Sequence, residues 1–377
     1  MQLFIKGGET MIIILDKKDC VGCGACANRC PEHCITMKED SEGFSYPNID
    51  KRMCINCGLC ERVCPVINLP KYREVQAVYA CYNKDEKVRM NSSSGGCFSL
   101  LADYVLRQKG YVVGAAFDTD LSVHHILIHS AEDLTLLRGS KYLQSRMENS
   151  YFLVKDVLGK GKTVLFSGTP CQVAGLKTFL GREYDNLFSV DVVCHGVPSP
   201  KVYREKLNEV EEKIGEKVVS VNFRDKTSGW NSFNLIFAGK KVLVKEIKQE
   251  SSYMQAFLKN ISVRPSCSVC RYNNEHSSAD LTIADYWGVE TKFPELSDNK
   301  GVTVVLVNTI KGKGLFEQVE KNAAVWKSNF THAAQYNFAM RNISLLHPAR
   351  EEFFARLGTK NMDILVPELL KKVENDK

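Results

Sequence analysis

The chain lacks any long apolar segment. No run approaches the roughly 20 residues that a transmembrane helix needs, and the apolar residues 11–15 are too few for the core of a signal peptide. The excess of one sign of charge is also small, because the formal net charge is only +6 and the basic residues are scattered. Nucleic-acid binders usually concentrate their basic residues. The sequence therefore predicts neither a membrane span nor a nucleic-acid partner.

Cysteine, in contrast, is abundant, with 15 residues. Eight of them form two runs that share one spacing. Each run has three cysteines at every third position, then a fourth cysteine four residues later, which proline follows. The runs are Cys20, Cys23, Cys26 and Cys30 before Pro31, and Cys54, Cys57, Cys60 and Cys64 before Pro65. Three thiolates at this spacing can hold one side of an iron–sulfur cube, and in two-cluster ferredoxins the fourth ligates the other cluster.

The two runs predict two [4Fe–4S] clusters. Cluster I is assigned to Cys20, Cys23, Cys26 and Cys64, and cluster II to Cys54, Cys57, Cys60 and Cys30. Zinc sites usually use paired cysteines, so zinc and disulfides are the weaker alternatives. Thiolate ligands accompany a reducing compartment, which predicts a cytoplasmic protein. Cys34 lies outside the pattern and is expected to be a small buried residue near the cluster.

The length of 377 residues exceeds that of a ferredoxin and indicates two or three domains. Strands that alternate with helices after residue 77 favour an α/β domain, here expected to have a mixed sheet. The expected order is a leader (1–10), an α+β ferredoxin-like domain (11–70), two successive parts of the α/β domain (71–160 and 161–325) and a peripheral helical tail (326–377).

A Ser/Gly-rich loop leads into an apolar helix that begins near Cys97. It contains Ser93, Ser94, Gly95 and Gly96. Free N–H groups, hydroxyls and the positive end of a helix dipole suit a phosphate or pyrophosphate. Serine beside glycine is also common at the start of plain helices, so both interpretations stay open. Residues 138–145 form a second polar and cationic stretch where a core would not need one.

Four further cysteines lie in the α/β part. Cys171, just before a helix expected at 173–180, and Cys194 follow successive strands, and Cys267 and Cys270 form a pair downstream. Sites in α/β sheets are built where strands end. The spacing leaves an iron–sulfur cluster and zinc equally open, with a redox-active dithiol as a third alternative.

Several motifs occur in a fixed order and carry a resemblance to a known family. They are Ser93 to Gly96, Arg138 to Tyr142, Gly168 to Gln172, Cys194 to Pro200, Phe223 to Lys226, Arg264 to Cys270 and Asp280 to Gly288. On these motifs, residues 14 to 310 resemble the coenzyme F420 hydrogenase/dehydrogenase beta subunit family. That family is similar to 7-hydroxymethyl chlorophyll a reductase and to the N-terminal half of an F420-dependent sulfite reductase.

The resemblance implies FAD in the α/β domain and a third [4Fe–4S] cluster. The implied cluster ligands are Cys171, Cys194, Cys267 and Cys270, and the implied flavin contacts are Ser94, Gly95, Gly96, Ser140, Lys141 and Thr169. Lys141 and Gln172 are expected beside the isoalloxazine ring as the catalytic candidates. Lys141 and Arg138 could stabilise negative charge on reduced flavin or on an acidic substrate, with helix-end cations as the alternative interpretation.

The predicted function is that of an iron–sulfur flavoprotein oxidoreductase. Electrons would pass between ferredoxin-type clusters and FAD, and FAD would exchange hydride with coenzyme F420 or another organic acceptor. The expected partners are a ferredoxin or another electron-transfer protein and a small-molecule hydride donor or acceptor; a homo-oligomer is compatible with the sequence. The alternative function is an electron-transfer subunit without its own substrate that docks to a catalytic partner.

Overall fold

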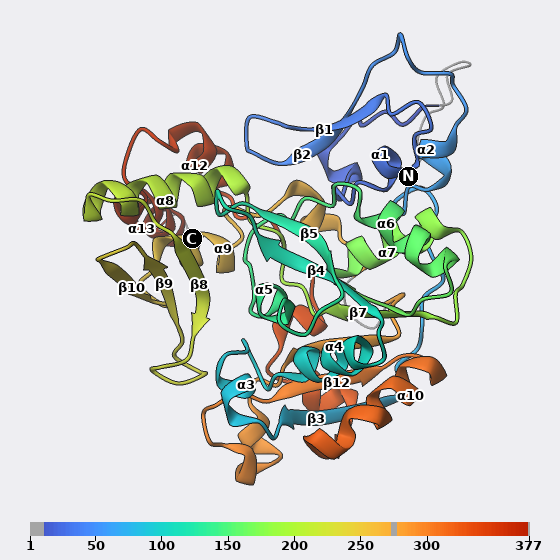
Figure 1. The fold of residues 1–377 in the computed structure, drawn as a ribbon. Coiled ribbons are helices and arrows are strands. Elements are labelled where there is room, and N and C mark those ends of the chain that lie inside the picture. Colours follow the sequence, from blue (N-terminus) through green and yellow to red (C-terminus); the bar gives the residue numbers. More distant parts are fainter. Residues whose placement is uncertain (1–10, 273–276, 376–377) are drawn as a thin grey trace.

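The computed structural model describes residues 11–272 and 277–375. The predicted leader, residues 1–10, lies outside the described residues. Figure 1 shows three parts: a small N-terminal unit, a central sheet with its helices, and a lobe that carries a second, smaller sheet. No helix in the described ranges is long and apolar enough to cross a membrane.

The N-terminal unit is built from short elements around its cysteines. Strands β1 (Ile35–Glu39) and β2 (Ser45–Ile49) form an antiparallel hairpin. Helices α1 (Ala25–Arg29) and α2 (Leu59–Arg62) each contain one cysteine of a run. A buried core of cysteines with Met11, Ile12 and Ile35 holds the unit together, so cysteines of both runs are also its packing residues.

The central sheet has eight strands in the order β13-β3-β12-β11-β7-β6-β4-β5. The strands are β3 (Ala77–Asn83), β4 (Tyr111–Phe117), β5 (Val123–Ile128), β6 (Val164–Gly168), β7 (Leu187–Val192), β11 (Leu281–Asp285), β12 (Thr303–Val307) and β13 (Ala323–Ser328). Strands β4, β6, β7 and β11 pair in parallel, and the remaining pairs are antiparallel. The predicted α/β fold with a mixed sheet is confirmed.

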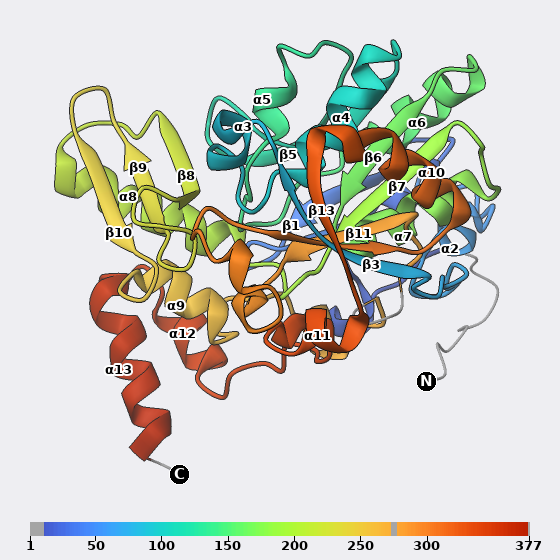
Figure 2. The ribbon, with the colours of Figure 1, turned by 90° about the horizontal axis from the view of Figure 1, so that it is seen from below.

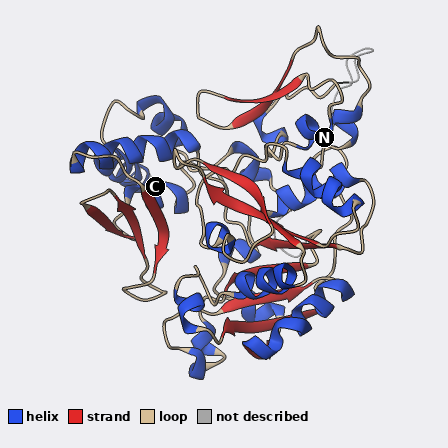
Figure 3. Ribbon diagram, in the orientation of Figure 1, coloured by secondary structure: helices blue, strands red, loops and turns tan. Residues whose placement is uncertain are grey.

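Helices cover both faces of this sheet (Figure 3). Alternate residues of a strand point to opposite faces, and in β6 Leu165 joins one core while Val164 and Phe166 join the other. The Leu165 face is covered by α4 (Cys97–Arg107) and α10 (Ile310–Val319). The other face is covered by α6 (Ser150–Gly159) and α7 (Pro170–Leu180), together with Cys23 and Ala25 of the N-terminal unit. The N-terminal unit therefore packs directly on α6 and α7.

The remaining lobe has its own three-stranded sheet and apolar core. Its elements are β8 (Ser220–Asp225), β9 (Asn234–Ala238), β10 (Leu243–Ile247), α8 (Pro200–Ile214), α9 (Ser252–Leu258), α12 (Arg350–Arg356) and α13 (Met362–Asn375). Figure 2 shows α13 beside α9 and this sheet. The predicted helical tail, residues 326–377, begins inside β13 and continues into helices, and the prediction that it is peripheral is wrong. Phe353 and Leu365 are fully buried in the lobe core, because the tail helices supply its missing apolar wall.

The short helices connect these larger elements. They are α3 (Glu86–Met90), α5 (Leu134–Leu137), α11 (Phe330–Ala334) and the 3-10 turns η1 (Lys17–Asp19), η2 (Pro265–Val269), η3 (Val289–Thr291), η4 (Pro294–Leu296), η5 (Glu320–Asn322) and η6 (Phe338–Met340).

Candidate functional site

The structure brings the cysteines of the two N-terminal runs together in the crossed arrangement that the spacing predicts. One hollow of about 320 Å³ is lined by Cys20, Cys23, Cys26 and Cys64. We call these four residues the first cysteine site. Three of the thiols come from the loop around α1, and the fourth comes from the end of α2, so the site forms only when the two runs pack against each other.

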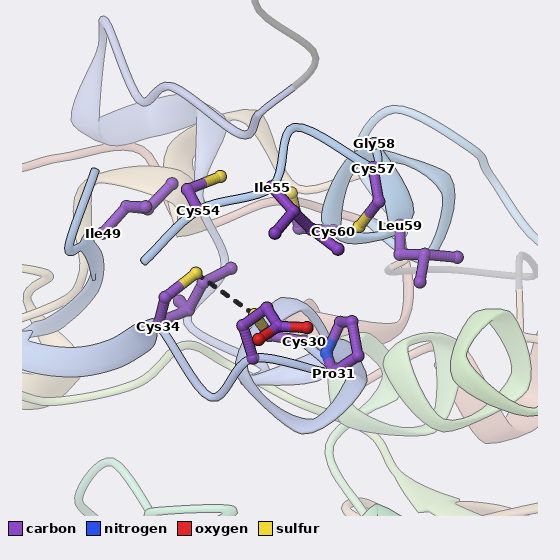
Figure 4. A pocket seen from close by; sticks show the side chains of 12 residues that line it. Cys30, Pro31, Cys34, Ile49, Cys54, Ile55, Cys57, Gly58, Leu59 and Cys60 are labelled. Carbon is purple, nitrogen blue, oxygen red and sulfur yellow. Dashed lines mark hydrogen bonds between the residues drawn. The ribbon is translucent and has the colours of Figure 1, made fainter. Parts of the chain in front are cut away.

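A second hollow of about 330 Å³ is lined by Cys30, Cys54, Cys57 and Cys60, which we call the second cysteine site (Figure 4). Cys57 is exposed at its rim, while Cys30 and Cys60 are buried. Cys34 also lines this hollow, with its Sγ 3.3 Å from the Sγ of Cys30. Cys34 is buried, as predicted, and lies beside the second cysteine site; burial raises the pKa of its thiol to about 12.

The donor geometry fits a group larger than one ion. In residues 11–272 and 277–375, no three His, Cys, Asp or Glu side chains lie close enough to hold a single metal ion. Zinc draws its sulfur ligands to about 2.3 Å from one centre. Four thiols spaced around a hollow suit a four-iron cube, whose irons each take one thiolate.

The four further cysteines also converge, and we call them the third cysteine site. Cys194 follows β7, Cys267 lies in η2 and Cys270 ends that turn. The expectation that Cys171 precedes its helix is wrong, because Pro170 starts α7 and places Cys171 in the first turn. Burial raises the pKa of Cys194 well above its ordinary value, and the nearby thiols of Cys267, Cys171 and Cys270 raise it further.

The same electrostatics hold for two other members of the third cysteine site. Burial raises the pKa of Cys171 to about 11 and that of Cys267 to about 12. Thiols that raise one another's pKa lie close together and ionise only with a strong positive charge among them. Iron supplies such a charge, because metal binding displaces the thiol protons. The donor set therefore fits a metal cluster.

The Ser/Gly-rich loop packs against the end of β12. Ser94 donates its hydroxyl to the carbonyl of Val302 (2.8 Å), and the N–H of Gly95 donates to Oγ1 of Thr303 (3.0 Å). A Cβ at Gly95 would lie 2.5 Å from the carbonyl oxygen of Cys81, so this close packing requires glycine. Gly96 is the N-cap of α4 and provides no side-chain cap. The first N–H groups of α4 are thus left for another acceptor.

The cationic stretch at 138–145 lies beside this loop. The N–H of Ser140 donates to Oγ of Ser93 (2.7 Å), and Nε of Arg138 donates to Oγ of Ser99 in α4 (3.1 Å). Lys141 instead folds back on its own segment. Its Nζ donates to the carbonyls of Leu136, Arg138 and Gly139. Burial lowers the pKa of Lys141 to about 7. These contacts lie at the C-terminal end of α5 and agree with the interpretation of Lys141 as a helix-end cation. Its catalytic role stays a prediction.

Gln172 and Thr169 interact at the start of α7. The Oε1 of buried Gln172 accepts a hydrogen bond from the N–H of Thr169 (2.9 Å). The Oγ1 of Thr169 lies 3.2 Å from the Sγ of Cys171. Both predicted flavin neighbours therefore position the helix turn that carries Cys171. Their direct contact with a flavin stays a prediction.

Sequence reasoning assigned no role to a buried polar network that joins four of the motifs. Arg224 of β8 pairs with both carboxylate oxygens of Asp285 (2.8 and 3.1 Å) and donates to the hydroxyl of Tyr142. Nε1 of Trp230 donates to the same carboxylate. Lys226 donates to the carbonyls of Ser94, Arg89 and Lys300, which ties the Ser/Gly-rich loop to the lobe. Charged residues at the end of an apolar strand were the available signal.

Asp191 of β7 provides a test of pH dependence. It accepts hydrogen bonds from Ser277 and Thr282, and burial raises its pKa to about 7. The folded chain then holds a proton that the unfolded chain has released, so this residue's contribution to stability falls as pH rises from about 4 to about 7 and is constant above. Asp191→Asn is expected to flatten the fall in melting temperature between about pH 4 and pH 7.

The control for this measurement is Asp50→Asn. Asp50 pairs with exposed Arg52, which holds its pKa at about 2, outside the tested range. Melting curves recorded anaerobically at several pH values would give the slopes. Equal slopes for the unmodified protein and Asp191→Asn would contradict the assignment.

Comparison with known proteins agrees with this arrangement. Residues 19–68 match the family model of a 4Fe-4S dicluster domain, so the chain is an iron–sulfur protein. Residues 78–150 match the N-terminal part, and residues 161–332 the C-terminal part, of the coenzyme F420 hydrogenase/dehydrogenase beta subunit. The two matches cover more than half of the chain, which therefore belongs to this family, as predicted.

A solved structure of the F420-reducing [NiFe] hydrogenase complex from Methanosarcina barkeri, derivatised with xenon, contains a similar chain. The TM-score is 0.46 at 15% sequence identity, and the alignment covers 81% of this chain and 94% of that chain. None of the curated proteins compared with the chain matches it.

Proposed function

We propose that the protein is an iron–sulfur flavoprotein oxidoreductase. It transfers electrons between ferredoxin-type clusters and FAD, and FAD exchanges hydride with an organic substrate, for which coenzyme F420 is the first candidate. One observation carries the proposal. Helix α7, which carries Cys171 of the third cysteine site, packs directly on the first cysteine site, because a Cβ at Gly175 of α7 would lie 3.0 Å from the Sγ of Cys23.

The three cysteine sites would each hold one [4Fe–4S] cluster. A flavin takes a hydride as two electrons and passes them singly to such clusters. The chain's own contribution is their spacing. The second and first sites share the short segment from Cys26 to Cys30, and α7 places Cys171 one turn from the helix surface that touches Cys23. The three sites thus follow one another from the surface into the α/β part.

The flavin would lie at the start of α4. The uncapped N–H groups there and the guanidinium of Arg138, bonded to Ser99, suit the negative charge of a pyrophosphate. Ser140 borders the same loop through its bond to Ser93. The family resemblance supports Ser94, Gly95, Gly96, Lys141, Thr169 and Gln172 as further neighbours of the cofactor.

Electrons would enter at the second cysteine site. Cys57 is exposed there, and Met53 and Ile55 beside it are 52% and 61% exposed. An exposed thiolate ringed by apolar side chains suits brief docking of a small electron-transfer protein such as a ferredoxin, since such contacts are small. This surface also favours the second candidate, a subunit without its own substrate that docks to a catalytic partner.

The test is the cofactor content of anaerobically purified protein. We expect one FAD and about twelve irons per chain, from three four-iron clusters, and flavin reduction when reduced ferredoxin is added. The reduced protein is then offered coenzyme F420, whose bleaching is followed by absorbance. About eight irons with zinc and no flavin would refute the proposal. A flavin-loaded protein that reduces no acceptor unless a partner is present would favour the second candidate.

A further inference from the structure

Arg264 is a buried cation at the junction of two cysteine sites. Its side chain is 1% exposed, and its three nitrogens donate only to neutral oxygens. Nε donates to the carbonyl of Cys20 (2.9 Å), Nη1 to Oε1 of Gln144 (3.2 Å) and Nη2 to the carbonyl of Ser45 (3.0 Å). The face of its guanidinium lies 4.2 Å from the ring centroid of Tyr46.

Arg264 differs from the other buried arginines in its charge balance. Arg89 pairs with Asp298, Arg224 with Asp285 and Arg350 with Glu42. Among the residues that the structure describes, no carboxylate forms an ion pair with Arg264. A buried charge without a counter-charge is strongly unfavourable, and a cation–π contact offsets only part of the cost. Arg264 therefore calls for a nearby negative charge.

Both neighbours of Arg264 are cysteine sites. Its Nη1 would lie 2.9 Å from a Cβ at Gly22, in the loop between Cys20 and Cys23 of the first site. In the other direction, Arg264 is the N-cap of η2, and its carbonyl accepts a hydrogen bond from the N–H of Cys267 of the third site (3.0 Å). Against the larger effect of burial, Arg264 lowers the pKa of both Cys171 and Cys267.

We propose that Arg264 is a shared counter-ion for the clusters of the first and third cysteine sites and raises both reduction potentials. This inference rests on the proposed function, which places clusters at these sites. Four thiolates give a cluster negative charge, and reduction adds one electron to it. A buried cation favours the reduced form, since net charge and surrounding polarity set the potential. Arg264 is thus a positioning residue that raises the reduction potentials of the first and third sites together and so keeps the two potentials similar.

The test compares Arg264→Gln with Arg264→Lys in the full chain by redox titration followed by electron paramagnetic resonance. In Arg264→Gln we expect the potentials of the first and third sites to fall, each by at least a tenfold shift in the ratio of reduced to oxidised form, about 59 mV. Arg264→Lys keeps the charge, so both potentials should stay close to those of the unmodified protein. The second cysteine site, which Arg264 does not contact, is an internal control and should not change.

The matched control is the double variant Glu42→Gln with Arg350→Gln. Arg350 is also buried and donates Nε to Val263, the residue before Arg264, but Glu42 neutralises it. Removing that pair should leave all three potentials in place. An unchanged first-site potential in Arg264→Gln, or an equal shift at all three sites, would overturn the inference.

Failure of the proposed function is read separately. The iron content of the unmodified protein tests the third cluster without reference to Arg264. The first-site potential tests Arg264 whatever that content is. Iron content and far-ultraviolet circular dichroism of each variant identify one that fails to fold. If Arg264→Gln fails to fold, the comparison rests on Arg264→Lys. A first-site potential in Arg264→Lys that falls as far as expected for loss of the charge would contradict the inference.

Discussion

Replacing Cys194 with alanine is expected to remove about four of the roughly twelve irons that the proposed function requires. Cys194 is the member of the third cysteine site whose pKa is raised by all three other thiols, which places it among them. Its loss leaves one iron without a thiolate. The clusters of the two N-terminal sites should stay, because none of their cysteines is replaced and most of them pack in the core of the N-terminal unit.

The functional consequence should be a break in electron transfer. Reduced ferredoxin should still reduce the N-terminal clusters of Cys194→Ala, but the flavin should stay oxidised, although dithionite reduces it directly. Rapid-mixing absorbance separates the flavin signal from the cluster signal. Reduction of the flavin at the unmodified rate would show that the third site does not lie on the electron route.

Cys97→Ala is the matched control for this variant. Cys97 is 1% exposed and packs in the apolar core beside Cys81, away from the third cysteine site. Its replacement should leave iron content and flavin reduction unchanged. If Cys97→Ala lost as much iron as Cys194→Ala, the loss would reflect general destabilisation and not a missing ligand.

The second large effect is expected from Asp285→Ala. It removes the only carboxylate that pairs with buried Arg224 in the described part of the chain, and it also leaves Nε1 of Trp230 without its acceptor. Breaking a buried ion pair from one side typically costs about 3–5 kcal/mol, because a charge stays buried without a partner. Urea unfolding under anaerobic conditions, followed by tryptophan fluorescence, measures the shift.

Asp50→Ala provides the control for this comparison. Asp50 pairs with Arg52, whose side chain is 89% exposed, and such exposed pairs contribute little to stability. Replacing Arg224 and Asp285 together by apolar residues of similar size should recover part of the loss, since no charge is then left behind. A similar loss for Asp285→Ala and Asp50→Ala would contradict a structural role for the network.

The N-terminal unit was predictable from the sequence because its ligands are close in the chain. A cysteine at every third position leaves few ways to place the thiols, and the structure gathers Cys64 with Cys20 and Cys30 with Cys54 as the spacing requires. The third cysteine site was not predictable from spacing. Cys194 and Cys267 are joined only by the fold, and the family motifs, not the residues between them, indicated the set. The occupancy of all three sites stays a prediction.

Buried charge was the other limit of the sequence. Arg264 and Arg224 look like surface arginines in the sequence, because their partners lie far away in the chain. For Lys141 and Gln172 the sequence suggested more than the structure shows. Their motifs suggested chemistry, whereas their visible contacts are with backbone groups of their own segments. The tail was wrongly predicted to be peripheral, because an apolar helix face, such as the one that contains Leu365, does not indicate which surface it packs against.

The position of β3 in the central sheet affects how the protein is made. β3 lies between β12 and β13, so both of its hydrogen-bonding edges wait for strands near the end of the chain. At about 5–20 residues per second, the ribosome needs on the order of 10–50 s to reach β13 after β3 has emerged. During that time β3 presents two open strand edges, which invite pairing with other chains. The cysteine-rich unit is complete well before the sheet closes, so cluster assembly can begin on a nascent chain whose α/β part has yet to fold.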